Sequence, residues 1–499
     1  MQRLLAIASI WTALVAPSAT AAESYLHRAD LLTRYTQDKF WDGRERTYLD
    51  EWPRKKSGLP YSTMWGLGIE FSALAAGARY DPLFYRPWTD QFFDGLERYF
   101  NRDKRLYSAY LGGTMDIYYD DNHWMILDYI EAYEATRSQR YLDKAVEIAD
   151  ACLGGIDDVH GGGSYWHIDT KKHPTKNTCS NAPLATALLR LSRHVADPEK
   201  KRAYAKQGEE LLAWLRKTLQ DKDGILWDHV NVKTGETKRD WKFTYNTALV
   251  IQAHLEVYRI RGDRSHLAEA VRLSKASARW LSPNSAAKGD HRYRDAAFFV
   301  VHLVEAQLGV YDITRDATLL SDCRKTADFY WRAWRQGGRG KLIDVAAAAR
   351  MQWLLARYGG KPEPNRRSVR IELPGRGTLT LAEVEVLSGG ENIARGGRAL
   401  QCSTYKDYYA GLALDGNTDG RFDSKSMAHT GENENSPWWE VEIDTKRKVD
   451  RIRIWNRTDA VPERLRGARV LILDGERKPV WEAVIERTPE PKVEFAVTP

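Results

Sequence analysis

Cysteine is scarce in this chain, and so are long apolar runs and clusters of charge of one sign. The 499 residues include only four cysteines, at widely separated positions, which argues against a metal cluster. Beyond the N-terminus no apolar stretch is long enough to span a bilayer, so we predict no transmembrane segment. Lysine and arginine are spread along the chain and the net charge is only +7, so we do not expect a nucleic-acid partner.

The four cysteines are Cys152, Cys179, Cys323 and Cys402. Three of them lie in segments with a helical pattern, where a buried free thiol is the ordinary expectation. A disulfide between Cys152 and Cys179 is compatible with an oxidising compartment, and the sequence leaves that alternative open.

The N-terminus has the pattern of a secretory signal peptide. Arg3 precedes an apolar run over residues 4–15, and small residues at 19–22 provide a cleavage site before Glu23. We therefore predict a signal peptide at residues 1–22 and a mature protein that is secreted or periplasmic.

Aromatic residues, by contrast, are abundant. They make up 11% of the chain, with 18 tryptophans and 25 tyrosines. Indole and phenol rings stack on the apolar faces of sugars, so this surplus favours a carbohydrate partner, although core packing accounts for most of these rings.

The pattern from residue 24 to about residue 360 is helical throughout. Apolar residues recur every three or four positions, which predicts twelve helices near residues 24–40, 62–79, 83–100, 122–137, 139–153, 178–196, 198–219, 243–262, 264–281, 291–311, 314–335 and 342–358. Short links alternate with long Gly-rich loops, so the helices form hairpins that must bury their apolar faces against neighbouring hairpins. Six hairpins in a ring would close on themselves.

An internal repeat supports the ring. The segment IEAYEATRSQRYLDKA at 130–145 matches LEVYRIRGDRSHLAEA at 255–270. The same offset places Asp120 and Asp121 opposite Tyr245 and Asn246, so the repeat itself does not require two acids. Equivalent helix starts lie at one end of such a ring, where Asn181, Tyr245 and Asp295 would line one mouth with the acid pair. Helix capping is the alternative for each, and for Asp295 it is preferred.

Asp120 and Asp121 are adjacent acids between aromatic neighbours, at the start of a helical segment. Like charges this close raise at least one pKa, as an acid/base or acid/nucleophile pair requires near neutral pH. Helix capping is again the alternative for the dipeptide alone.

Three segments carry a family resemblance: YYDDNHW at 118–124, KNTCSNAPLATALLRL at 176–191 and FTYNTALVIQAHLEVYRIRGD at 243–263. They resemble glycoside hydrolase family 76, whose bacterial members are endo-α-1,6-mannanases and whose fungal relatives are cell-wall transglycosylases. The resemblance implies an (α/α)6 barrel over residues 23–360 and a retaining mechanism, with Asp120 as nucleophile and Asp121 as general acid/base. His123 departs from the family, which commonly has a small residue there, and this affects the expected neighbouring subsite.

The spacing of the acids is consistent with retention. Retaining glycosidases hold their carboxyls about 5 to 5.5 Å apart, and neighbouring Cα atoms lie about 3.8 Å apart, so adjacent residues reach the short spacing most easily. For substrate binding we predict aromatic stacking and hydroxyl contacts. The residues are Tyr119, Trp124, Trp65 and Tyr245 for stacking, with a core role an equal alternative for Trp65, and Asn122, Asn181 and Asn246 for hydroxyls. His167, His173 and Lys176 lie near or in a long loop and are candidate substrate contacts, with solvent exposure as the default.

After Gly360 the pattern changes from helical to alternating, which predicts a linker at 361–367 and an antiparallel β-sandwich at 368–499. The segments AEVEV, NIARGGRALQCST, ALDGNTDG and SPWWEVEID resemble the discoidin or coagulation factor 5/8 type C fold, shared with carbohydrate-binding module family 32. The sandwich is therefore a candidate carbohydrate-binding module, with Tyr405, Tyr408 and Tyr409 as candidate contacts. Of Trp438 and Trp439, alternation places one in the core.

The resemblance also implies a structural calcium in the sandwich. Its ligands would be Asp415, Asn417 and Ser426, with Glu494 from the last strand. The alternative is that residues 415–417 form only a turn.

We therefore predict a secreted, monomeric, endo-acting α-1,6-mannanase that hydrolyses the α-mannan backbone with retention and needs no cofactor for catalysis. The alternatives are a transglycosylase that uses the same acids, and a non-catalytic glycan-binding protein. Other α/α-barrel sugar enzymes, such as an unsaturated glucuronyl hydrolase or an epimerase, fit the acid-pair motif less well.

Overall fold

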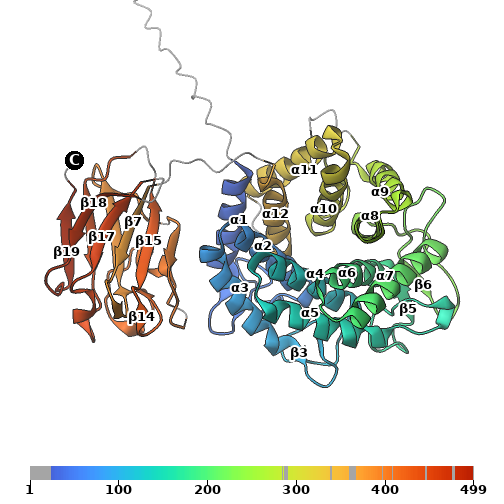
Figure 1. Ribbon diagram of the computed structural model, residues 1–499, viewed down its shortest axis with the longest axis horizontal. Coiled ribbons are helices and arrows are strands. Elements are labelled where there is room, and N and C mark those ends of the chain that lie inside the picture. The colour runs from blue at the N-terminus through green and yellow to red at the C-terminus, as the bar shows by residue number, and fades with distance from the viewer. Residues whose placement is uncertain are drawn as a thin grey trace, which may run out of the picture.

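The computed structural model describes residues 24–497, except 284, 286–289, 338–339, 359–366, 396, 407, 444–446 and 475–477. The predicted signal peptide at 1–22 and nearly all of the predicted linker lie outside the described residues. A helical domain and a β-sandwich lie side by side, with the sandwich next to α1 and α3 (Figure 1).

The helical domain is a closed double ring. Its inner helices are α2 (Met64–Tyr80), α4 (Tyr119–Thr136), α6 (Thr178–His194), α8 (Thr244–Arg261), α10 (Ala297–Thr314) and α12 (Leu342–Ala356). Its outer helices are α1 (Tyr25–Phe40), α3 (Pro82–Leu96), α5 (Gln139–Cys152), α7 (Pro198–Thr218), α9 (Arg264–Ala276) and α11 (Ala317–Arg335). Each inner helix packs on the next, and α12 packs on α2. The predicted (α/α)6 barrel is confirmed.

The two rings differ in sequence because they differ in burial. The outer helices α5 and α11 are amphipathic and bury one face only, whereas the inner helices α2 and α8 are buried on nearly every side. Among the described residues, α10 is the one helix long and apolar enough to cross a bilayer by length and composition. It is an inner helix of the barrel.

The starts of α4 and α10 differ from the predicted ones and change the interpretation of the acids. Helix α4 starts at Tyr119 instead of residue 122, so both acids lie inside its first turn, and its N-cap Tyr118 makes no side-chain capping bond. Helix α10 starts at Ala297 instead of residue 291. Asp295 precedes it and its carboxylate accepts hydrogen bonds from the N–H and hydroxyl of Thr244, at 2.7 and 2.8 Å. Asp295 therefore caps the start of α8, in agreement with the preferred interpretation of that residue.

Arginine and glutamate pairs fill the end of the barrel away from the helix starts. Arg350, only 4% exposed, binds Glu131 at 2.6 Å and Glu305 at 3.4 Å and donates to the carbonyl of Ser72. Glu256, the repeat partner of Glu131, binds three further arginines. These pairs surround a cavity of about 260 Å³.

The C-terminal domain is built on two main antiparallel sheets, beside two short strand pairs. One has the order β11-β10-β16-β19 and the other β12-β15-β7-β17-β18. The strands are β7 (Arg367–Glu372), β10 (Glu383–Ser388), β11 (Glu391–Asn392), β12 (Ala399–Gln401), β15 (Trp438–Ile443), β16 (Arg451–Trp455), β17 (Arg469–Leu473), β18 (Pro479–Val484) and β19 (Lys492–Ala496). Trp439 is fully buried in the core while Trp438 is half-buried, as alternation predicts.

Arg398 connects the sandwich to the barrel. Its guanidinium pairs with Asp30 inside α1 and with Asp81 at the N-cap of α3, and it lies above the ring of Phe84 at 4.8 Å. The Tyr409 hydroxyl donates to Gln91 of α3. Tyr409 is therefore a domain contact.

The arginine–glutamate pairs at the far end of the barrel lead to a prediction about stability. Because Arg350 is buried, Arg350→Met leaves Glu131 without its cation and Glu305 with only the more distant Arg190. We therefore expect a loss of about 3 kcal/mol of unfolding free energy. Arg357 lines the same cavity but is 48% exposed and paired with Asp312, so Arg357→Met is the matched control and should cost less than about 1 kcal/mol. Denaturant unfolding measures both, and equal losses would contradict the prediction.

Candidate active site

The second residue of four inner helices lies at one cavity. Trp65 on α2, Asp120 on α4, Cys179 on α6 and Tyr245 on α8 all line a cavity of about 550 Å³ at the N-terminal end of the inner ring. Since each helix enters the ring in the same way, equivalent positions converge. The symmetry of the barrel thus places the cavity, and the residue type at the second position of each inner helix determines its chemistry.

Asp120 accepts three hydrogen bonds. The indole N–H of Trp166 donates to Oδ2 at 2.9 Å, the thiol of Cys179 lies 3.3 Å from the same oxygen, and the N–H of Asp121 donates to Oδ1 at 3.1 Å. Burial raises the pKa of Asp120 above its usual range, and these three donors oppose that rise because they stabilise the anion.

Asp121 has a different environment. It also lines the cavity, but burial together with the charges of Asp120 and Asp116 raises its pKa far above the usual range. Asp120 therefore ionises first as pH rises. Over the interval between the two ionisations the site holds one carboxylate and one carboxylic acid, which is the arrangement that a nucleophile and a general acid require.

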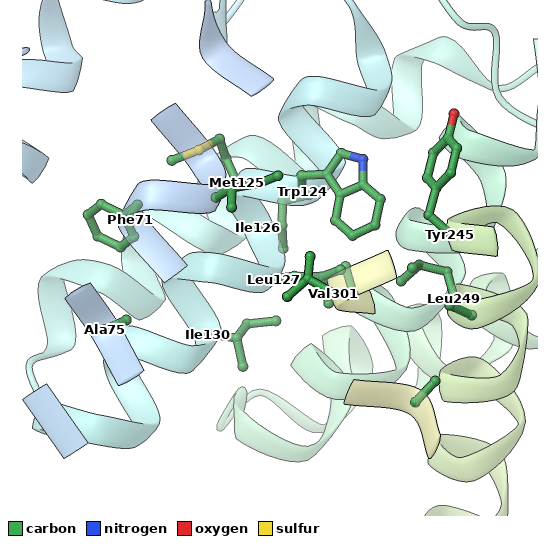
Figure 2. Packing of buried hydrophobic residues seen from close by; sticks show 14 of the residues in the cluster. Phe71, Ala75, Trp124, Met125, Ile126, Leu127, Ile130, Tyr245, Leu249 and Val301 are labelled. Atoms are coloured by element: carbon green, nitrogen blue, oxygen red, sulfur yellow. The ribbon is translucent and has the colours of Figure 1, made fainter. Parts of the chain in front are cut away.

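Aromatic rings form the cavity wall around the acids. Tyr245 stacks on Phe299 with ring centroids 4.5 Å apart, and Trp65 lies against both Tyr245 and Phe299. Figure 2 shows Trp124 of α4 and Tyr245 of α8 beside the apolar packing of Leu127, Leu249 and Val301. Trp65, Trp124 and Tyr245, all predicted to stack on sugar, line the cavity.

The predicted hydroxyl contacts Asn122 and Asn181 are instead fully buried. Asn122 accepts from the N–H of Tyr107 and donates to the carbonyls of Tyr107 and Tyr118. Asn181 repeats this pattern one hairpin later, with Ser164 and Asn177 as its backbone partners. Each asparagine fastens the preceding loop to the start of its helix, so neither side chain faces the cavity.

Asn246 and Tyr119 also lie behind the wall. Asn246 is 1% exposed and donates to Asp228 Oδ1 at 3.3 Å, so it positions a third carboxylate that does line the cavity. The Tyr119 ring packs against Gly155, where a side chain would collide with it. Neither residue lines the cavity.

His123, expected to affect a subsite, points into the barrel wall. Its Nδ1–H donates to the carbonyl of Ser180 at 2.8 Å, and the ring is fully buried. Burial lowers the pKa of His123 to about 3, so the ring is neutral and holds α4 against α6.

Acids in the C-terminal domain form a second candidate site. The described residues contain no group of three or more histidine, cysteine, aspartate or glutamate side chains that could hold a metal ion, but Glu383 on β10 lies beside the Asp415 loop. The N–H of Gly416 donates to Glu383 Oε1, and Glu383 Oε2 is buried without a partner. Burial and the charge of Asp415 raise the pKa of Glu383 to about 8.

Of the predicted calcium ligands, the structure brings two together. The hydroxyl of Ser426 donates to Asp415 Oδ2 at 2.5 Å, and Asn417 follows in the same loop. Glu494 binds Arg451 and Arg453 on the neighbouring strand β16 and is exposed. The carboxylate beside Asp415 is therefore Glu383 and not Glu494.

A third cluster lies on the sandwich near Tyr405 and Tyr408. His429 Nε2 lies 3.4 Å from a guanidinium nitrogen of Arg464, and the ring of Tyr405 packs on His429 with centroids 4.7 Å apart. Arg457 lies over the ring of Phe422 at 4.5 Å and binds Asp459. Burial, Arg464 and Arg457 lower the pKa of His429, so its ring is neutral beside two cations.

The sequence model of glycosyl hydrolase family 76 matches residues 20–354, most of the chain. This chain belongs to that family. A model described as a NedA-like, galactose-binding domain matches residues 412–497. The predicted combination of a family 76 domain with a factor 5/8 type C domain is thereby confirmed, and membership of family 76 supports a glycoside hydrolase.

Solved structures share the fold of the family 76 domain. A family 76 mannosidase of Bacteroides thetaiotaomicron VPI-5482 is 21% identical and has a TM-score of 0.60, with 67% of this chain and 100% of that chain covered. An inactive variant of the α-1,6-mannanase GH76A of Salegentibacter sp. HEL1_6, in complex with α-1,6-mannotriose, is 20% identical with a TM-score of 0.56. The matched region covers 67% of this chain and 99% of the mannanase chain.

Curated relatives match each domain separately. The meiotically up-regulated gene 191 protein of Schizosaccharomyces pombe is 30% identical over 199 residues, which is 38% of this chain and 45% of that protein. Fucolectin-3 of Anguilla japonica is 40% identical over 87 residues, 16% of this chain and 47% of that protein. The chain spans about half the length of the curated relatives it matches.

Sequence reasoning missed several residues that line the cavity of this family 76 domain. Trp166, Lys172, Asp228, Trp241 and Phe299 come from loops or from an inner-helix start. His173, for which the sequence predicts solvent exposure in a loop, also lines the cavity, whereas Lys176 is buried against Asp157 and His167 binds Asp116. The missed signal was the concentration of aromatic residues and histidine in the two long loops before α6 and α8.

Proposed function

We propose that this family 76 protein is an endo-acting α-1,6-mannanase that hydrolyses the α-mannan backbone with retention of configuration. The observation that carries the proposal is the unequal environment of Asp120 and Asp121, which lets one be an anion while the other holds a proton. The α-1,6-mannanase name of a structural neighbour supports the linkage.

In the first step Asp120 attacks the anomeric carbon. A bond forms between a carboxylate oxygen and that carbon, the glycosidic C–O bond breaks, and the proton of Asp121 goes to the departing sugar oxygen. In the second step Asp121, now a carboxylate, takes a proton from water. The water oxygen bonds to the anomeric carbon, the ester bond breaks, and Asp120 returns as a carboxylate.

Exposed rings at the cavity rim support endo action. Tyr110 is 42% exposed and Trp241 is 49% exposed, and both also line the cavity. Exposed rings stack on sugars beyond the one being cleaved, which favours binding within a chain over recognition of its end. We further propose that the protein acts as a monomer and is secreted or periplasmic after its signal peptide is removed.

For the sandwich we propose binding of a fucose- or galactose-type monosaccharide, on the basis of the fucolectin relatives. The cluster of His429, Arg457 and Arg464 supports this proposal. Two guanidinium groups can donate to ring hydroxyls, and Tyr405 and Phe422 offer ring faces. The neutral imidazole of His429 donates its Nδ1–H to the carbonyl of Thr430, so its Nε2 can accept one more bond. Mannan cleavage would then occur close to a second glycan that holds the protein.

We also propose a structural calcium in the sandwich, held by Glu383, Asp415, Asn417 and Ser426. Calcium prefers carboxylate and carbonyl oxygen ligands. The unpartnered Oε2 of Glu383 beside Asp415 fits a cation at that position. A bound cation would stabilise the loop at 415–417 and has no part in the reaction.

The first prediction concerns the acids. On unbranched α-1,6-mannan we expect oligosaccharides whose fresh reducing ends have the α configuration by NMR. Asp121→Asn should lower kcat about 10²- to 10⁴-fold, since proton transfer is lost, and Asp120→Asn should abolish turnover. Asp143→Asn on the exposed face of α5 is the matched control and should retain full activity.

The pH profile tests the same assignment. Activity needs Asp120 ionised and Asp121 protonated, so kcat/KM should rise through the pKa of Asp120 and fall through that of Asp121. Because burial raises both values, both limbs should lie above the ordinary aspartate value of about 3.9. Inverted β products, or new glycosidic bonds in place of reducing ends, would contradict retaining hydrolysis.

The second prediction concerns the sandwich. Isothermal titration of the full chain should show binding of fucose or galactose that mannose does not displace. Arg464→Ala should weaken this binding at least about tenfold, as loss of a charge-assisted hydrogen bond does. Arg487→Ala, an exposed change elsewhere on the sandwich, should leave binding unchanged. Absence of binding to both sugars in the unmodified protein would refute the proposal.

The third prediction concerns calcium. Calcium at about 100 times its Kd stabilises the domain that binds it by about 2.7 kcal/mol, so the melting transition of the sandwich should rise by several degrees. Glu383→Gln should remove this rise, whereas Glu494→Gln should keep it. If Glu494→Gln removes the rise and Glu383→Gln keeps it, the ligand assigned from the structure is wrong.

A further inference from the structure

The thiol of Cys179 lies against the carboxylate proposed as nucleophile. Its sulfur is 3.3 Å from Asp120 Oδ2, within reach of an S–H hydrogen bond, and the side chain is 5% exposed at the cavity wall. All four cysteines are free thiols, so the alternative disulfide to Cys152 is not formed.

The position of Cys179 explains the contact. It is the second residue of α6, as Asp120 is the second residue of α4, so the two side chains meet at equivalent helix starts. Tyr245, the second residue of α8, lines the same cavity. Two neighbouring inner helices thus place the thiol and the carboxylate within hydrogen-bond distance of each other.

The proton of the thiol stays on sulfur. Burial and the charges of Asp120 and Asp228 raise the pKa of Cys179 well above its usual range. A protonated thiol beside an ionised carboxylate can only donate, and Oδ2 also accepts from Trp166. Both side-chain donors therefore hold the same oxygen, which leaves Oδ1 with only the N–H of Asp121.

We propose that Cys179 is a positioning residue for the nucleophile: its S–H bond orients Asp120 and stabilises it as a carboxylate. The proposal rests on the proposed function, because it assigns to Cys179 a part in the step that Asp120 carries out. The donor stabilises the charge of free Asp120 and of the carboxylate that leaves in the second step. It stabilises the neutral ester less.

Other charged groups near Asp120 also influence its ionisation. Asp121 on the same helix, Asp116 in the loop before it and Asp228 before α8 are acids, and Lys172 and His173 are basic groups at the cavity. Trp65 of α2 and Phe299 of α10 bring no charge. The variants below change none of these residues, so a shift in the titration of Asp120 reports the donor itself.

The test is the titration of Asp120 in the full chain, labelled with ¹³C at aspartate Cγ and followed by NMR, with the resonance assigned by its loss in Asp120→Asn. Cys179→Ala removes the donor, so the Asp120 midpoint should rise by about 0.5 pH unit or more. Cys179→Ser replaces the thiol with a stronger hydrogen-bond donor, so the midpoint should fall below the original value. Cys323→Ala, which removes a fully buried thiol on α11, should leave it unchanged.

With α-1,6-mannan as substrate, the acidic limb of the kcat/KM profile should shift in the same direction as the Asp120 midpoint in each Cys179 variant. If mannan is not hydrolysed, the NMR titration still tests the contact, so failure of the proposed function and failure of this inference are separate results. If Cys179→Ala does not fold, as judged by circular dichroism, Cys179→Ser alone decides. An Asp120 midpoint unchanged in every folded Cys179 variant would overturn the proposal.

Discussion

The burial of two adjacent carboxylates at the start of one inner helix is the constraint on which the site depends. Two like charges cannot both remain ionised at such a position without large cost, so their environments must differ. Asp120 receives donors from Trp166, from Cys179 and from the backbone, whereas Asp121 faces mainly negative charge. The barrel supplies this difference because its inner helices begin around one cavity.

At both ends of the closed ring, buried polar groups need hydrogen-bond or ion-pair partners. At the helix starts, Asn122 and Asn181 satisfy the backbone of the incoming loops and so keep the first turns in place. At the far end Arg350 and Arg190 neutralise glutamates that would otherwise be buried and unpaired. The repeat pair Glu131 and Glu256 belongs to this second network, which explains why the repeat retains glutamate there while the acids at 120 and 121 are not repeated.

The periodic pattern of apolar residues is enough to predict the twelve helices, because every helix of the ring must bury apolar residues. The inner helices bury nearly every side and the outer helices bury one face. The acid pair is found from its chemistry and its family resemblance. The roles of Asn122 and Asn181 are not predictable, since asparagine suits sugar hydroxyls and backbone amides equally. The role is decided by whether the backbone of the preceding loop lies against the asparagine side chain. That placement depends on the tertiary structure. Trp166 is missed for the same reason: it reaches Asp120 from a loop whose path has no periodic signal.

Glu383 shows where resemblance by sequence position fails. A ligand is expected on the last strand, but β19 pairs with β16, so the side chain of Glu494 is used by Arg451 and Arg453. Sheet order instead brings β10 beside the loop at 415–417, although that strand lies well before it in the chain. A buried carboxylate with a free oxygen needs either a proton or a cation. The raised pKa of Glu383 describes the first state, and the calcium that we propose beside Asp415 would give the second.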